Sequence, residues 1–292
     1  MIKLGMGEDT MTFKCVRQSL EVKVGSLTVA NHRPITVIAG VNVLDTARVN
    51  LLVAETLVKA CDARGIPLVF KASFDKANRS SYTSPRGPGL KKGIHQLRGL
   101  KERFAFPIVT DIHVPEQANE VAEYIDLIQI PAFLCRQTDL IQAACDTGRP
   151  LHIKKMQNMS PSEALLIQEK CAAFGSTDVI LCERGSAFGY QRLVVDPLSM
   201  YELQTHKAPV SFDVTHALQC PGGANGQTSG RGGALTLPLA RAGTSIGIAA
   251  LFFECHPEPT QALCDGASAL PLHLVDQLLD EIQAIDRLVK SM

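Results

Sequence analysis

The apolar positions of this chain follow two alternating patterns. Short continuous apolar runs, of the length of buried strands, lie at residues 35–41, 68–74, 108–113, 127–133, 151–156, 179–185, 210–216 and 246–256. Apolar residues at helical spacing lie between and after these runs, at residues 45–64, 89–104, 115–123, 137–147, 160–174, 197–206, 233–243 and 271–290. Together the runs predict eight consecutive strand–helix units.

Strict alternation of apolar strands with helices indicates a parallel sheet covered by helices. Eight such units close most economically into an α/β fold of the (β/α)8 barrel type. Residues 21–30 alternate around Gly25 and Ser26 and predict a β-hairpin that caps the bottom of the barrel. We expect a flexible N-terminal extension at residues 1–18 and one barrel domain at residues 19–292. An open doubly wound sheet is the alternative, but no G-x-G-x-x-G follows the first strand.

Charge and cysteine content narrow the functional class. The 29 basic and 29 acidic residues balance, which argues against binding to nucleic acid or to a membrane surface. No apolar run approaches the length of a membrane span. The first residues, with Glu8 and Asp9, lack the apolar region of a secretory signal. The 9 cysteines form no CxxC pair, so we expect reduced thiols in a cytoplasmic protein.

The most informative segment is KASFDKANRSS at residues 71–81, directly after an apolar run. It sets Lys71, Lys76 and Arg79 against the single acid Asp75. Cations supply charge to an anionic ligand, and small polar residues supply orienting hydrogen bonds. In a closed barrel the carboxyl ends of all strands meet at one mouth. The segment therefore predicts an anion site at that mouth.

Other strand ends carry further polar residues of the same kinds, namely Asn42, Asp111, His113, Arg136, Gln137, His152, Lys154, Lys155, Gln157, Glu183, Arg184, Asp213, His216, Glu254 and His256, with Asp265 in the loop beyond. A single residue of this kind is usually a surface charge, a structural histidine or a helix cap. The concentration of Lys and Arg instead predicts a mouth for substrates with several negative charges. Lys154 and Arg184, on adjacent strands, could share one phosphate.

Two kinds of chemistry fit these residues. Lys71, Lys76 or Lys154 could form a Schiff base with a carbonyl substrate. Alternatively, the cations hold two anionic substrates together, and catalysis comes from orientation and electrostatic stabilisation. The residue types alone leave both possibilities open.

A metal site is the third possibility. His216, Glu254 and Asp265 have the ligand types for a divalent ion, and Asn42 on the neighbouring strand is the natural fourth member. An Asn amide is a poor ligand for zinc or iron. We therefore expect no metal and no cofactor, with Asn42 forming hydrogen bonds where a metal ligand could have stood.

Long segments of the chain resemble one family throughout residues 20–290. They are KASFDKANRSS (71–81), PRGPG (85–89), QIPAFLCRQTDL (129–140), LCERGSAFGY (181–190), FDVTHALQ (212–219) and CDGASALPL (264–272). These segments are similar to those of 3-deoxy-D-manno-octulosonate 8-phosphate synthases and follow the same order. The resemblance implies a barrel enzyme, usually a homotetramer, that joins phosphoenolpyruvate to D-arabinose 5-phosphate without a Schiff base. Its product feeds the Kdo sugar of lipopolysaccharide or a related sugar of plant cell walls.

The resemblance also implies roles for individual residues. Phosphoenolpyruvate would be held by Lys76, Lys154 and Arg184, with Lys71 and Gln157 nearby. The pentose phosphate would be held by Asn78, Arg79 and Ser80, and by Arg136 across a subunit interface. Water addition and proton transfer would be steered by His216 and Asp265, supported by Asp111, His113 and Glu254. Asn42 stands where metal-dependent members carry Cys, which resembles the metal-independent branch.

The chain departs from the family pattern most clearly at residues 221–233, PGGANGQTSGRGG. We expect a mobile lid there, in which Arg231 falls one place early, and Gly232 and Gly233 should weaken the start of the next helix. A catalytically impaired duplicate with an altered lid is therefore one alternative. The sister enzyme that uses erythrose 4-phosphate is the other, although Ala77 and Asn78 replace its usual Pro-Arg.

Overall fold

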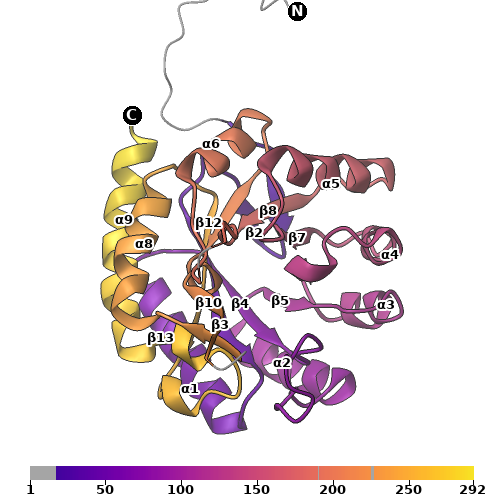
Figure 1. The fold of residues 1–292 in the computed structure, drawn as a ribbon, viewed down its shortest axis with the longest axis vertical. Coiled ribbons are helices and arrows are strands. Elements are labelled where there is room, and N and C mark those ends of the chain that lie inside the picture. The colour runs from indigo at the N-terminus through magenta and orange to yellow at the C-terminus, as the bar shows by residue number, and fades with distance from the viewer. Residues whose placement is uncertain (1–17, 190, 225–226) are drawn as a thin grey trace, which may run out of the picture.

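Eight parallel strands close into a barrel in the computed structural model, which describes residues 18–189, 191–224 and 227–292 (Figure 1). The strands are β3 (Thr36–Val43), β4 (Leu68–Ser73), β5 (Ile108–Asp111), β6 (Leu127–Ile130), β7 (Leu151–Lys154), β8 (Val179–Glu183), β9 (Val210–Asp213) and β12 (Ala250–His256). Strand β12 pairs with both β3 and β9, and this closure confirms the barrel against the open sheet. Apart from Gln18, the expected extension lies outside the described residues.

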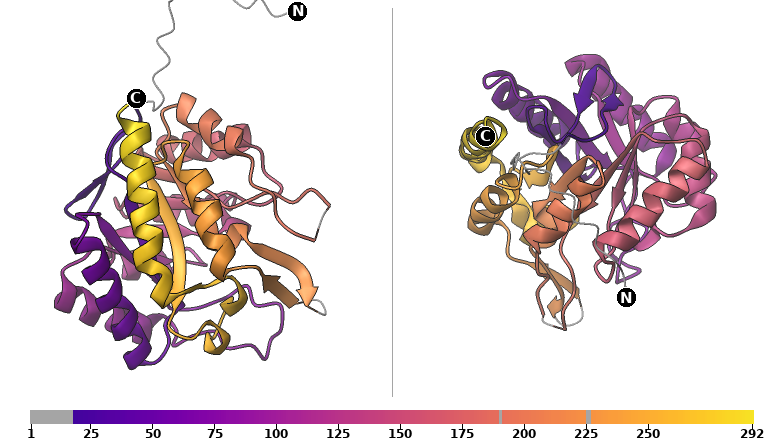
Figure 2. Two further views of the ribbon diagram at one scale, coloured as in Figure 1. Left: turned by 90° about the vertical axis from the view of Figure 1, so that its left-hand side faces the viewer. Right: turned by 90° about the horizontal axis from the view of Figure 1, so that it is seen from above.

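Helices surround the strands on the outside (Figure 1). They are α1 (Ala47–Asp62), α2 (Leu90–Phe104), α3 (Gln117–Ala122), α4 (Thr138–Asp146), α5 (Pro161–Ala173), α6 (Pro197–Thr205), α8 (Thr236–Thr244) and α9 (Val275–Lys290). Helix α5 shows why the sequence signals work, because Ser160 and Glu163 form a capping box and Pro161 occupies the first turn. Helix α9 packs beside α8 and α1 (Figure 2). No helix in the described part of the chain is long and apolar enough to cross a bilayer.

The predicted hairpin closes the bottom of the barrel. Strands β1 (Val22–Val24) and β2 (Leu27–Val29) pair antiparallel around Gly25. Their valines share one buried cluster with residues from the barrel strands, including Ile38, Val69, Val109, Leu127, Ile180 and Phe252. The barrel interior is therefore apolar at its amino-terminal end, which leaves the other end for polar side chains.

Several predicted strands continue beyond their true ends. The run expected to reach residue 133 stops at Ile130, because Pro131 has no N–H to continue the ladder, and a 3-10 turn, η1 (Ala132–Leu134), follows. Phe133 is 55% exposed, so its apolar character misled the prediction. Likewise, Asp213 ends β9 and caps a short helix, α7 (Val214–Ala217). The sequence prediction thus assigned to the strands some residues that form the turns at the mouth of the barrel.

The expected lid contains an unpredicted pair of strands. Strand β10 (Gln219–Ala224) pairs antiparallel with β11 (Gln227–Gly230), and the hairpin projects from the barrel (Figure 2). An ideal Cβ on Gly232 would lie 2.5 Å from the carbonyl carbon of Ser268, which explains a glycine there. Regular helix resumes only at Thr236, after η2 (Gly233–Leu235), as the glycines led us to expect.

The loop after β12 is built from short turns. They are η3 (Pro259–Gln261), η4 (Gly266–Ser268), the two-residue strand β13 (Leu270–Pro271) and η5 (Leu272–Leu274). The backbone N–H of Gly232 donates to the carbonyl of Ala267 at 2.8 Å. This bond fastens the end of the lid to the loop that carries Asp265.

Candidate active site

A cavity of about 480 Å³ opens at the carboxyl ends of the barrel strands. Most of the predicted site residues line it, namely Lys71, Lys76, Asn78, Arg79, Ser80, Asp111, His113, Lys154, Gln157, Arg184, His216 and Asp265. Asn42 and Glu254 lie beside the cavity, in contact with its wall. Arg136 does not line it, and its side chain is 67% exposed. Side chains from distant parts of the sequence thus gather at one mouth.

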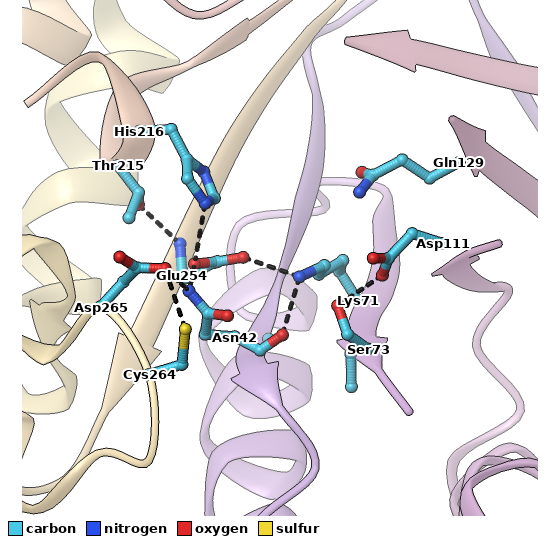
Figure 3. Close-up of polar contacts among 12 residues, drawn as sticks. Asn42, Lys71, Ser73, Asp111, Gln129, Thr215, His216, Glu254, Cys264 and Asp265 are labelled. Atoms are coloured by element: carbon cyan, nitrogen blue, oxygen red, sulfur yellow. Dashed lines mark hydrogen bonds and ion pairs between the residues drawn. The ribbon is translucent and has the colours of Figure 1, made fainter. Parts of the chain in front are cut away.

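Lys71 forms a buried ion pair with Glu254 (Figure 3). Its Nζ donates to Glu254 Oε1 at 2.7 Å and to the carbonyl oxygen of Asn42 at 2.9 Å. Burial lowers the pKa of Lys71, and the charge of Glu254 opposes this effect. Burial would raise the pKa of Glu254, but Lys71 and His216 hold it below its usual value. The charge of Lys71 therefore stabilises the charge of Glu254, and the reverse is also true.

The Asn42 amide lies between two carboxylates. Its Nδ2 donates to Glu254 Oε2 at 2.5 Å and to Asp265 Oδ2 at 3.0 Å. A register shift in β3 between Gly40 and Val43 places Asn42 there. Gly40 permits the close approach of β3 and β4, because an ideal Cβ would lie 2.0 Å from the carbonyl oxygen of Lys71. One amide nitrogen thus bridges two acidic groups.

The predicted quartet of Asn42, His216, Glu254 and Asp265 is brought together. His216 Nε2 lies 3.7 Å from Glu254 Oε2. Asp265 has a positive φ of 48°, a conformation that costs a non-glycine residue energy and is common at functional sites. Burial would raise the pKa of Asp265, but the charges of His216 and Lys76 hold it at about 2. Among the described residues, no group of three or more His, Cys, Asp or Glu side chains is arranged to hold a metal.

Asp213 is a central residue that the sequence analysis placed at a strand end but to which it assigned no role. Its Oδ2 accepts a hydrogen bond from Lys154 Nζ and lies 2.7 Å from His216 Nδ1. Burial would raise the pKa of Asp213, but His216 and Lys154 hold it well below its usual value. Its position at the end of β9 was the available signal. The sequence could not show that Lys154 and His216 share it.

Unpaired polar atoms face the other side of the cavity. Arg184 Nη2 donates to Gln219 Oε1 at 2.6 Å, and Gln219 Nε2 donates to Asp265 Oδ1 at 3.0 Å. Arg184 Nη1 and Gln157 Oε1 are buried without a hydrogen-bond partner among the described residues. Burial lowers the pKa of Lys76, but Glu254 and Asp111 reverse this and raise it, so Lys76 is charged. The unpaired Arg184 N–H and the Lys76 ammonium suit an anion, whereas the Gln157 oxygen can only accept a hydrogen bond. The sequence analysis assigned no role to Gln219 either.

Asp111 and His113 form a pair on a further part of the wall. His113 Nε2 lies 3.0 Å from Asp111 Oδ2, and Ser73 Oγ donates to Asp111 Oδ1 (Figure 3). Burial would raise the pKa of Asp111, but the bond to His113 and the charge of Lys76 lower it strongly. By contrast, Lys155 is directed away from the cavity, with Nζ 3.5 Å from Glu183 Oε2 and donating to the Met159 carbonyl.

A neutral, fully buried histidine lies beneath the cavity without lining it. His152 Nδ1 lies 3.1 Å from Gln129 Oε1, and its Nε2 lies 2.8 Å from Ser211 Oγ. Its ring stacks on Phe252, with 5.9 Å between ring centroids. The pKa of His152 is well below its usual value, mainly because of burial, and the charge of Lys154 lowers it further. His152 therefore belongs to the support beneath the site.

Comparison with known proteins gives a consistent assignment. Residues 18–291 match the DAHP synthetase I family. A 2-dehydro-3-deoxyphosphooctonate aldolase of Synechococcus sp. (strain WH7803) is 50% identical over 276 residues, which cover 93% of this chain and 96% of the relative. Proteins of the same name from Pseudomonas fluorescens (strain SBW25) and Acinetobacter baumannii (strain SDF) are 49% and 50% identical over 270 residues. These cover 92% of this chain and 96% and 94% of the relatives.

The buried ion pair can be tested with Glu254→Gln. The substitution leaves Lys71 either unpaired or forced to lose its proton, and we expect the free energy of unfolding to fall by about 3 kcal/mol. Glu102→Gln removes the exposed pair with Arg98 and should change stability by less than about 0.5 kcal/mol. Urea unfolding measures both variants, and equal effects would contradict the assigned interdependence.

His152 should make stability dependent on pH. In the unfolded chain this histidine binds a proton below about pH 6.5, whereas burial keeps it neutral when folded. The unfolded state therefore binds more protons, so stability is present above pH 6.5 and is lost on acidification, by up to about 1.4 kcal/mol per pH unit. Replacing His152 with Gln should flatten this slope in unfolding measurements between pH 5 and 7.5. Replacing the exposed His206 with Gln should leave the slope unchanged, and equal slopes for all three proteins would refute the prediction.

Proposed function

This chain belongs to the DAHP synthetase I family, and we propose that it is a 2-dehydro-3-deoxyphosphooctonate aldolase. The reaction joins phosphoenolpyruvate, D-arabinose 5-phosphate and water, and gives 3-deoxy-D-manno-octulosonate 8-phosphate and inorganic phosphate. The observation that carries this proposal is the single cavity in which two groups of anion-binding side chains flank His216 and Asp265. Near-complete coverage by relatives of that name supports it.

Phosphoenolpyruvate would bind to the deeper of the two groups of anion-binding side chains. Lys76, Lys154 and Arg184 supply positive charge there, and Arg184 Nη1 is a buried donor without a partner among the described residues. Gln157 lines the same cavity. Lys71 lies at the base of this group, paired with Glu254. Charged donors around a dehydrated phosphate and carboxylate bind strongly because little water competes with them.

The pentose phosphate would bind to side chains of the segment that follows β4. Asn78, Arg79 and Ser80 line the cavity near its opening. Arg79 Nε is buried without a hydrogen-bond partner among the described residues, so it can donate to a phosphate oxygen. The two substrates would then meet above His216 and Asp265, which converts their encounter into an oriented one.

The chemistry follows from this orientation. C3 of phosphoenolpyruvate attacks the aldehyde carbon of the pentose, water adds at C2, and phosphate leaves by cleavage of its C–O bond. Asp265 is ionised at neutral pH, with a pKa of about 2, so it can accept a hydrogen bond from the added water and orient it. Asp213 orients His216 through Nδ1, so Nε2 is the nitrogen that can exchange a proton. Asp111 and His113 would support the aldehyde end.

The contacts of Lys71 and Lys154 favour electrostatic catalysis over a Schiff base. Lys71 Nζ donates to two oxygens, and Lys154 Nζ is bonded to Asp213. A nearby carboxylate favours the ammonium form, which is a poor nucleophile, and at Lys71 this effect of Glu254 opposes the lowering of the pKa by burial. The role proposed for both lysines is therefore to stabilise negative charge as the bond to phosphate breaks.

We also propose that the reaction is independent of metal. The Asn42 amide nitrogen donates to both Glu254 and Asp265 and so binds the two carboxylates that a cation would otherwise bridge. A cation that bridged the two carboxylates would have to displace these N–H donors. This contact supports a reaction that needs no divalent ion.

We also propose a cytoplasmic homotetramer whose subunits each form one barrel domain at residues 19–292. The exposure of Arg136 supports this assembly, since its guanidinium lies outside its own cavity, where its only ion-pair contact among the described residues is an exposed one, 4.0 Å from Glu163. Sedimentation of the assayed protein would give its mass directly.

The first experiment is an assay of phosphate release from phosphoenolpyruvate. We expect release with arabinose 5-phosphate, undiminished by a chelator, and at least about 100-fold less with erythrose 4-phosphate, as required for a site that recognises the sugar by hydrogen bonds. Release with erythrose 4-phosphate instead would assign the sister activity. Binding of both substrates without release, by folded protein, would favour an impaired duplicate with an altered lid.

Asn42→Cys tests the proposed metal independence. A thiolate at this position, together with His216, Glu254 and Asp265, would provide four ligands for zinc or ferrous ion. After anaerobic loading, we expect about one bound ion per chain by elemental analysis. Asn42→Ser, which removes the amide without adding a ligand, should bind none. Equal metal content in the two variants would show that the four side chains are wrongly placed.

A further inference from the structure

Phe252 lies beneath the two buried lysines of the cavity floor. It is fully buried in β12, two residues before Glu254, so both side chains are on the inner face of the barrel. Lys154 Nζ lies 3.2 Å from the centroid of the Phe252 ring, and Lys71 Nζ lies 5.7 Å from it. Both distances fall within the range of cation–π contact.

The same ring separates the polar mouth from the apolar bottom of the barrel. Phe252 belongs to the buried cluster that includes Val22, Val24 and Val29 of the hairpin. The neutral His152 ring stacks nearly parallel to it, with 14° between the ring planes. Lys154 therefore has an aromatic surface for part of its environment in place of water.

The two contacts of Lys154 have different electrostatic consequences. Asp213 stabilises the ammonium by neutralising it, and a neutralised pair attracts an anion weakly. An aromatic ring stabilises a buried cation through its quadrupole and carries no net charge. The ring contact therefore reduces the cost of burying Lys154 while its positive charge stays available to a substrate.

We propose that Phe252 is a positioning residue for anionic substrate, which holds the ammonium of Lys154, and more weakly that of Lys71, beneath the reacting phosphoenolpyruvate. The proposal rests on the proposed function only for the identity of this anion. If the proposal is right, anion binding depends on the electron density of the Phe252 ring and not on the size of the ring. A purely structural role would depend on size and shape.

Fluorinated phenylalanines at position 252 separate these two properties. The 4-fluoro, 3,5-difluoro and 3,4,5-trifluoro forms progressively remove electron density from the ring face and change its volume little. We expect Kd and KM for phosphoenolpyruvate to rise stepwise along this series, by about 3- to 30-fold at the trifluoro form. The KM for arabinose 5-phosphate should stay within about twofold, because its proposed side chains lie away from the ring.

Phe253 provides a matched control. It is equally buried on the same strand but belongs to the core cluster outside the barrel. The same series at position 253 should leave Kd within about twofold, because the cation–π contacts of Lys71 and Lys154 are to Phe252. Phe252→Leu, which retains apolar volume without a π face, should weaken binding at least as much as the trifluoro form. Circular dichroism confirms that each protein is folded.

Inorganic phosphate serves as a second probe in calorimetry. If the protein turns over no substrate but its phosphate affinity falls along the series at position 252, the proposed function fails and this inference stands. Constant affinity for both anions along that series would overturn the inference, as would an equal trend at position 253. Failure of the unsubstituted protein to bind either anion would overturn both proposals.

Discussion

A lysine ammonium can be removed from water only if other groups replace its hydration, and Lys71 and Lys154 are both buried at the foot of the mouth. Glu254 and Asp213 provide the opposite charges for Lys71 and Lys154. Glu254 is on β12, and Lys71 is on β4. These strands are brought near each other because β12, the last strand of the barrel, pairs with β3, which pairs with β4. The Lys71–Glu254 pair therefore depends on closure, because an open sheet would separate the two residues and leave Lys71 uncompensated.

Shared partners tie the rest of the site to these two pairs. Glu254 accepts from Asn42 as well as from Lys71, and Asp213 contacts His216 as well as Lys154. Asp265 in turn contacts Asn42 and Gln219. A change in the charge of one member is therefore felt by several others, which is typical of buried polar networks in a low dielectric.

The lid is attached to this network at both ends. Gln219, the first residue of β10, contacts Arg184 and Asp265, and Gly232 is bonded to the loop that contains Asp265. Asp265 itself has a strained backbone conformation. Movement of the hairpin would thus alter the position of a proposed catalytic carboxylate, so residues 221–233 affect more than access to the cavity.

The sequence by itself determined the order of strands and helices, the hairpin and the end of the barrel at which polar residues gather. These follow from periodicity and from the convergence of parallel strands, which need no knowledge of side-chain contacts. It did not determine where strands stop, as Phe133 shows, because apolar residues also occur on exposed turns. Nor did it identify Asp213, Gln219 or Phe252 as partners of the site. An Asp at a strand end, a Gln before a glycine-rich loop and a Phe in an apolar strand are ordinary residues in sequence. Only the closed barrel, which places side chains from β7, β9 and β12 within a few ångströms, decided what each of them contacts.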